Sequence, residues 1–188
     1  MALKIINQIV SGVKGGITAT LEGTADVGST IVKSVADATA STLKGAGELV
    51  VKGIQFPASI VKGAIDGVTS IGVSVLKAIK GIVQGAVEGA VKGGASEKEA
   101  VSGAVQQAIY SAKELGENIG MVAVESVKGA VNGVKQLGGD TVGATKIAIV
   151  AALEAAKEVG SGTTDVVKNA LSEGVDGAKT VLNELKES

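Results

Sequence analysis

Residues 83–89, V-Q-G-A-V-E-G, carry the pattern that decides the fold. The same phase returns 22 residues later at Val105 (V-Q-Q-A-I-Y-S) and again at Val127 (V-K-G-A-V-N-G). Self-similarity at a fixed period of this length is typical of repeat architectures. Related heptapeptides begin at Ile17, Thr39, Val61, Ile149 and Leu171.

An eleven-residue period underlies the 22-residue one. Cut into elevens from Val10, the chain gives sixteen units that end at Leu185, and 32 of their 34 charged residues fall on unit positions 2, 5, 6, 9 and 10. Eleven residues make three turns at about 3.67 residues per turn, which is close to the α-helical value. On such a helix the charged positions form one continuous polar arc, and the apolar positions form another of nearly equal width. The sequence therefore predicts an all-α protein.

The uninterrupted phase favours one very long amphipathic helix built of 11- and 22-residue repeats. Such a helix could be straight, kinked or folded as a hairpin, and it would pack in a multi-helix coiled coil or a helical barrel. The predicted organisation is an apolar N-terminal segment (1–9), the sixteen repeats (10–185) and a polar C-terminal tail (186–188).

Several residues argue against an unbroken helix. Pro57 removes a backbone donor within the repeat and is expected to kink the helix. Residues 93–96, Gly-Gly-Ala-Ser, form the candidate hinge, because Ser96 and Glu99 have the spacing of a capping box that starts a new helix. Weaker candidate breaks lie at 138–141 and 160–163. The uninterrupted phase favours a continuous or kinked helix over a hairpin at 93–96.

Composition excludes much chemistry. The chain of 188 residues contains no histidine and no cysteine, so His-based acid–base catalysis, thiol chemistry and common zinc sites are ruled out. The net charge is −1 and there is no arginine, so the sequence lacks the excess positive charge that nucleic-acid binding requires. Paired acids such as Glu154 and Glu158 lie on the polar arc, where a solvated surface is the expected role. We therefore predict no enzyme activity, catalytic residue, cofactor, metal or small-molecule substrate.

Glycine is unusually abundant, with 28 residues. Each costs a helix roughly 0.8–1 kcal/mol relative to alanine, so an isolated helix is expected to be unfolded until its apolar arc is covered by other copies or by lipid. Small residues on that arc would let helices approach closely. The alternative is loose packing without specificity; the alternation of Gly and Val at unit position 8 favours the close-approach role. The predicted helix-contact residues are Gly67, Gly72, Ala86, Gly89, Gly94, Ala108, Gly116, Ala130, Gly133, Gly138 and Gly160.

The repeats over residues 10–185 resemble those of known protein families at the level of pattern. Eleven-residue repeats rich in Val, Ala, Gly, Thr and Lys resemble the repeats of synucleins and perilipins. The 22-residue unit is similar to that of exchangeable apolipoproteins. Late embryogenesis abundant proteins and hendecad coiled coils share the period. The resemblance to the first three families implies an extended amphipathic helix that coats lipid surfaces.

Together these features predict a non-enzymatic, self-assembling helical protein that associates with membrane or lipid and folds on oligomerisation or lipid contact. Its expected partners are copies of itself and lipid, and its expected location is at a membrane. The alternative is a soluble structural or stress-protective helical bundle in the cytoplasm.

Overall fold

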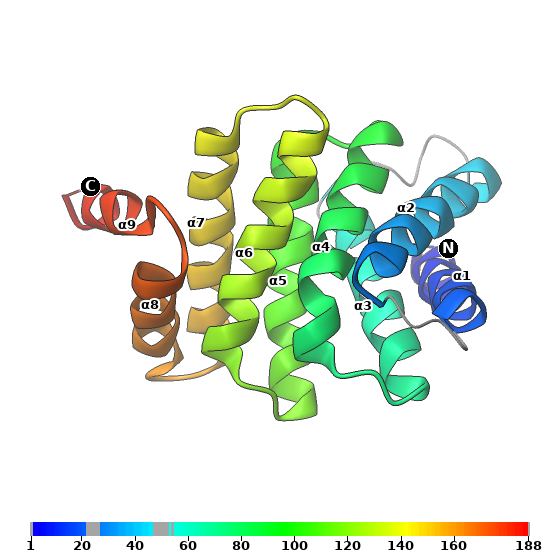
Figure 1. Cartoon of the computed structure of the whole chain (residues 1–188), viewed down its shortest axis with the longest axis horizontal. Helices are drawn as coiled ribbons and strands as arrows, with labels where there is room; N and C mark the ends of the chain where they lie inside the picture. Colours follow the sequence, from blue (N-terminus) through cyan, green and yellow to red (C-terminus); the bar gives the residue numbers. More distant parts are fainter. Residues whose placement is uncertain (1, 22–26, 47–52, 54, 188) are drawn as a thin grey trace.

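The computed structural model describes residues 2–21, 27–46, 53 and 55–187, and within these ranges the regular structure is entirely α-helical (Figure 1). The all-α prediction is confirmed. The very long helix is wrong, because the described chain is divided into nine packed helices. These are α1 (Ala2–Leu21), α2 (Val27–Ala46), α3 (Gln55–Ser70), α4 (Val75–Lys92), α5 (Glu97–Leu115), α6 (Ile119–Gln136), α7 (Thr141–Val159), α8 (Thr163–Gly174) and α9 (Ala178–Glu187).

One helix and one turn make up each 22-residue unit through the centre of the chain. Helices α4 to α7 are 18 or 19 residues long, and each is followed by a short turn. The turns use glycines at unit position 8: Gly94 and Gly116 have φ angles of 104° and 70°, where a side chain would strain the backbone. A left-handed glycine at or just after the end of α4, α5 and α6 lets the chain reverse there, whereas Gly160 after α7 has an extended backbone with φ 158°.

Helix starts follow the expected capping chemistry. At α5 the Glu99 amide donates to Ser96 Oγ at 3.2 Å, and the Ser96 amide donates to Glu99 Oε2 at 3.3 Å, so the predicted capping box is confirmed. Residues 93–96 are thus one of a series of turns. Asn118 and Asp140 cap α6 and α7 in a similar way through their side-chain oxygens.

The expected kink at Pro57 needs correction. Pro57 is the third residue of α3, where the amide of the first turn has no helical acceptor, so proline is tolerated there and does not kink a longer helix. The predicted division into 1–9, 10–185 and 186–188 stays a prediction; in the structure α1 begins at Ala2 and α9 extends to Glu187. Met1 and Ser188 lie outside the described residues.

The helices stack in two rows. Helices α1, α3, α5 and α7 form the odd row, and α2, α4, α6 and α8 form the even row; each helix packs on the next helix of its own row and on its sequence neighbour in the other row. Figure 1 shows this stack, with α1 and α2 at one end and α8 and α9 at the other. This is the architecture of an α-solenoid, in which each unit contacts only nearby units.

The core lies between the two rows. Its most regular component is the first residue of the repeated heptapeptide, which recurs every 22 residues and falls near the middle of a helix. All eight of these side chains have 0% exposure: Ile17, Thr39, Val61, Val83, Val105, Val127, Ile149 and Leu171. This position of the apolar arc is therefore buried against other helices of the same chain, while Val142 of the same arc is 77% exposed.

Pairs of glycines set the spacing within each row. A Cβ on Gly85 of α4 would lie 2.6 Å from the carbonyl oxygen of Val32 in α2, and one on Gly89 would lie 2.6 Å from Thr39 Cβ. A Cβ on Gly63 would likewise collide with a carbonyl oxygen of α1, and one on Gly129 with a carbonyl oxygen of α4. At Gly67 and Gly133 the added Cβ would lie 3.0 Å from the nearest atoms of the neighbouring helix, which is a tight contact. Small residues four apart thus bring neighbouring helices of one row into direct contact with each other's backbone.

Replacing a row glycine should therefore destabilise the fold although it raises helix propensity. We expect Gly85→Ala to lower the free energy of unfolding by about 1–3 kcal/mol, because the added methyl group collides with the α2 backbone. The matched control is Gly15→Ala in α1, where nothing lies within 4 Å, and it should stabilise by about 1 kcal/mol. Urea unfolding measures both. Equal stabilisation by the two variants would show that the row contact is loose.

Candidate binding groove at the amino-terminal end of the stack

The two ends of the stack are closed differently. At the carboxyl-terminal end, α9 packs on both α7 and α8, and its side chains Ala178, Val181 and Leu182 are buried. At the amino-terminal end, α1 and α2 pack on each other and on the next helices of their rows, and no described helix covers their outer side. The outer side of α1 and α2 is therefore not covered by any helix that the structure describes.

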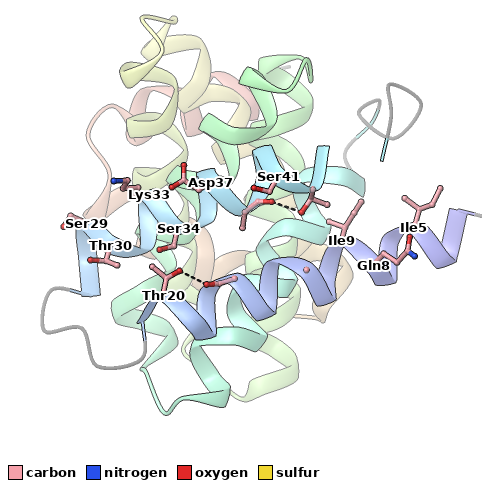
Figure 2. A pocket seen from close by; sticks show the side chains of 14 residues that line it. Ile5, Gln8, Ile9, Thr20, Ser29, Thr30, Lys33, Ser34, Asp37 and Ser41 are labelled. Carbon is pink, nitrogen blue, oxygen red and sulfur yellow. Dashed lines mark hydrogen bonds between the residues drawn. The ribbon is translucent and has the colours of Figure 1, made fainter. Parts of the chain in front are cut away.

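A groove with a volume of about 1090 Å³ runs along this surface between α1 and α2 (Figure 2). We call it the end groove. In Figure 2 Ser34 of α2 lies between the two helices, near Thr20 of α1. The lining residues are mostly small or hydroxyl-bearing: Ile5, Gln8, Ile9, Gly12, Gly16 and Thr20 from α1, and Ser29, Thr30, Lys33, Ser34, Asp37, Ala38, Ser41 and Thr42 from α2.

The end groove arises from substitutions within the repeat. Helices of one row are 44 residues apart in register, so Gly12 and Gly16 of α1 correspond to Phe56 and Ile60 of α3. Those two side chains are only 2% and 0% exposed inside the stack. In α2, Ala38 similarly replaces Ile82 of α4. The large side chains that fill the interior are absent at the end, and this absence leaves the groove.

The chemistry of the end groove suits binding by shape and hydrogen bonding. Lys33 and Asp37 are exposed on α2, one helical turn apart, and supply one charge of each sign. The hydroxyls of Thr20, Ser34 and Thr42 line its interior. Within the part of the chain that the structure describes, no group of three or more acidic side chains is placed to hold a metal ion.

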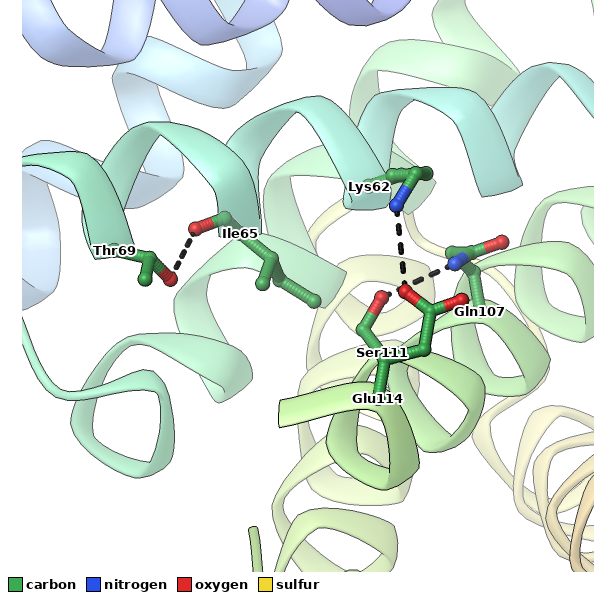
Figure 3. Close-up of polar contacts among 6 residues, drawn as sticks. All are labelled: Lys62, Ile65, Thr69, Gln107, Ser111 and Glu114. Carbon is green, nitrogen blue, oxygen red and sulfur yellow. Dashed lines mark hydrogen bonds and ion pairs between the residues drawn. The ribbon is translucent and has the colours of Figure 1, made fainter. Parts of the chain in front are cut away.

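Polar contacts also connect successive helices of the odd row. Lys62 Nζ of α3 lies 3.5 Å from Glu114 Oε2 of α5, as Figure 3 shows, next to the hydrogen bond from Gln107 to Ser111 within α5. Between α5 and α7, the Tyr110 hydroxyl donates to Glu158 Oε2 at 2.6 Å. The contacts of Lys62 with Glu114 and of Tyr110 with Glu158 lie on the polar surface and link successive helices of the row.

Tyr110 is the most perturbed titratable group of this surface. Burial, the hydrogen bond to Glu158 and the negative charges of Glu158 and Glu154 raise the pKa of Tyr110 to about 12. All of these causes disfavour the phenolate. The arrangement keeps the hydroxyl protonated as a donor between two helices, which is a structural role.

The structure places the predicted small residues in three kinds of environment. Gly67, Gly89 and Gly133 lie against a neighbouring helix of the same row, where an added Cβ would come within 3.0 Å of another side chain. Ala86, Ala108 and Ala130 are fully buried within α4, α5 and α6. The glycines of unit position 8 differ from the expectation: Gly72, Gly94, Gly116, Gly138 and Gly160 lie at helix ends, and Gly72, Gly116 and Gly138 have open space around them.

Sequence reasoning missed the first glycine of each row contact, namely Gly63, Gly85 and Gly129. The signal was present, because the repeated heptapeptides at Val61, Val83 and Val127 contain two glycines four residues apart. It also missed the end groove, whose lining becomes visible only when residues 44 apart are compared.

No family model, curated protein or solved structure matches the chain. Among the helices that the structure describes, none combines the length and the apolar content needed to cross a bilayer. The functional argument therefore depends on the packing of the helices and on the end groove.

The hydrogen bond of Tyr110 gives a direct spectroscopic test of the odd row. The chain has one tyrosine, so its ultraviolet tyrosinate absorbance reports this site alone, with an expected midpoint near pH 12. Because the folded pKa exceeds the ordinary value of 10.0, stability from this group is complete below pH 10 and is lost as the pH rises toward 12.

The variant Glu158→Gln should lower this midpoint while leaving it above the ordinary value, since burial persists. The matched control Glu154→Gln removes only a weaker charge effect and should lower it less. An unchanged midpoint in Glu158→Gln would contradict the contact between α5 and α7.

Proposed function

We propose that the chain is a non-enzymatic structural protein, a helical-repeat scaffold that folds without lipid and offers its end groove for binding. The observation that supports this most is the burial of the repeat side chains, of which eight with 22-residue spacing have 0% exposure. Burying a Val, Leu or Ile side chain contributes roughly 1.5–3 kcal/mol. A single chain thus covers the most regular part of its own apolar arc.

Lipid association, which the repeat pattern predicts, would use the same residues differently. A lipid-surface helix needs its apolar arc free to meet acyl chains, whereas in the folded stack that arc lies between helices. Membrane binding by this route would require the stack to open. It stays a prediction, and the two functions differ in whether helicity depends on lipid.

Circular dichroism of the dilute chain without detergent tests the proposal. We expect high helicity and one cooperative thermal transition, because the contacts that stabilise the helices are intramolecular. Adding phosphatidylcholine vesicles, or vesicles that also contain phosphatidylglycerol, should not raise the helicity. A weakly helical chain that becomes helical only with vesicles would contradict the scaffold and support the lipid-surface alternative.

Two apolar residues of α7 distinguish the scaffold from the lipid-surface helix by mutation. Ile149 and Val142 both lie on the apolar arc, but Ile149 is 0% exposed and Val142 is 77% exposed. In the scaffold, Ile149→Ala should cost about 2–5 kcal/mol of unfolding free energy, and Val142→Ala should change it by less than about 0.5 kcal/mol. Chemical unfolding of the lipid-free chain provides the measurement. Similar effects of both substitutions would show that the arc is not buried as described.

A further inference from the structure

The end groove is the surface that the scaffold leaves without an occupant among the described helices. We infer that it is the interface of a homodimer, in which α2 of each copy lies in the end groove of the other across a two-fold axis. This inference rests on the folded stack of the proposed function and names its partner, a second copy of the chain.

The shape of the end groove fits a helix. Its sides are two packed helices, and along α1 the side chains are missing at Gly12 and Gly16, so an approaching helix can come close to the backbone. Inside the stack, neighbouring helices of a row approach through glycines four residues apart in the same manner. Gly12 and Gly16 have the same spacing in the end groove, where an added Cβ would lie 3.7 Å from Thr42 Oγ1 and 3.4 Å from Ala38 Cβ of α2. No described helix covers the outer side of this surface.

A serine hydroxyl of α2 lines the end groove and is available for a hydrogen bond with a partner. Ser34 is only 6% exposed and lines the end groove, yet it forms no hydrogen bond with any residue that the structure describes. The hydroxyl lines the groove, where a group from outside the chain can reach it. The corresponding positions of the interior, Ala78 and Val122, carry no polar group. A hydroxyl at the end of the stack is suited to a donor or acceptor from outside.

The charges on α2 are complementary to themselves under two-fold symmetry. Lys33 and Asp37 are exposed one helical turn apart and form no ion pair with each other. When two α2 helices meet antiparallel, Lys33 of each copy lies opposite Asp37 of the other. A two-fold interface uses the same patch on both subunits, so both pairs form at once.

The opposite end favours a closed dimer over a head-to-tail chain. There α9 already packs on α7 and α8, and its apolar side chains Val181 and Leu182 are used within the same copy. The free end of a second copy is consequently again α1 and α2. Pairing of the two equal ends closes the assembly at two copies.

Charge reversal tests the interface without touching the core. In sedimentation equilibrium, the unmodified chain should show a monomer–dimer equilibrium. Lys33→Glu makes both residues of the patch negative and Asp37→Lys makes both positive, so each variant alone should have a dimer dissociation constant raised roughly tenfold or more. An equimolar mixture of the two variants should dimerise at least as well as the unmodified chain. The matched control is Lys77→Glu, the exposed equivalent of Lys33 on α4, which should leave the constant unchanged.

The outcomes distinguish this inference from the scaffold itself. Circular dichroism of every variant should be unchanged, since the altered side chains are exposed. A monomer at all concentrations, an open-ended polymer, a dimer insensitive to Lys33→Glu, or an equal effect of Lys77→Glu would each overturn the interface. Folded, lipid-independent helicity in those cases would leave the scaffold standing.

Discussion

The contact between helices of one row at paired glycines is the constraint on which the rest of the structure depends. At Gly85 and Gly89 there is no space for a single methyl group between α4 and α2. Similar contacts join α3 to α1 and α6 to α4. Because these glycines must meet the same part of each neighbour, successive helices need similar lengths. The 22-residue unit keeps these glycines in register along each row.

The periodicity of the sequence was enough to predict helices, but not where they end. A helix of 18 residues and a turn of four residues preserve the 22-residue phase, so a stack of helices and one long helix share the same apolar arc. The distinguishing signal was the alternation at unit position 8. Val83 and Val105 lie in the middle of helices and are fully buried, whereas Gly94 and Gly116 lie in turns with positive φ. Close approach between the helices of this chain is made by other glycines, such as Gly85 and Gly129.

The candidate site could be predicted only in part, because it depends on register between helices. Gly12 and Gly16 look like ordinary repeat glycines until they are aligned with Phe56 and Ile60, 44 residues later. That alignment requires knowing that α1 and α3 are neighbours in one row. The high apolar content that suggested lipid has a second explanation in the fold, since a chain with few aromatic residues fills its core with Val, Ile and Ala. The repeated residues thus predicted which side chains fill the interior. The end groove is formed where residues of α1 and α2 differ from their equivalents 44 residues later.

A distance between spin labels at Thr69 and Lys113 tests the central claim, which is that the chain reverses after each 22-residue unit. These exposed residues occupy equivalent positions at the ends of α3 and α5, 44 residues apart. Double electron–electron resonance should be recorded with excess unlabelled protein, so that only intramolecular distances count. Adjacent packed helices lie about 8–10 Å apart, so the labels should be separated by little more than their own linkers. A separation near 66 Å, the length of about 44 residues of continuous helix, would contradict the stack.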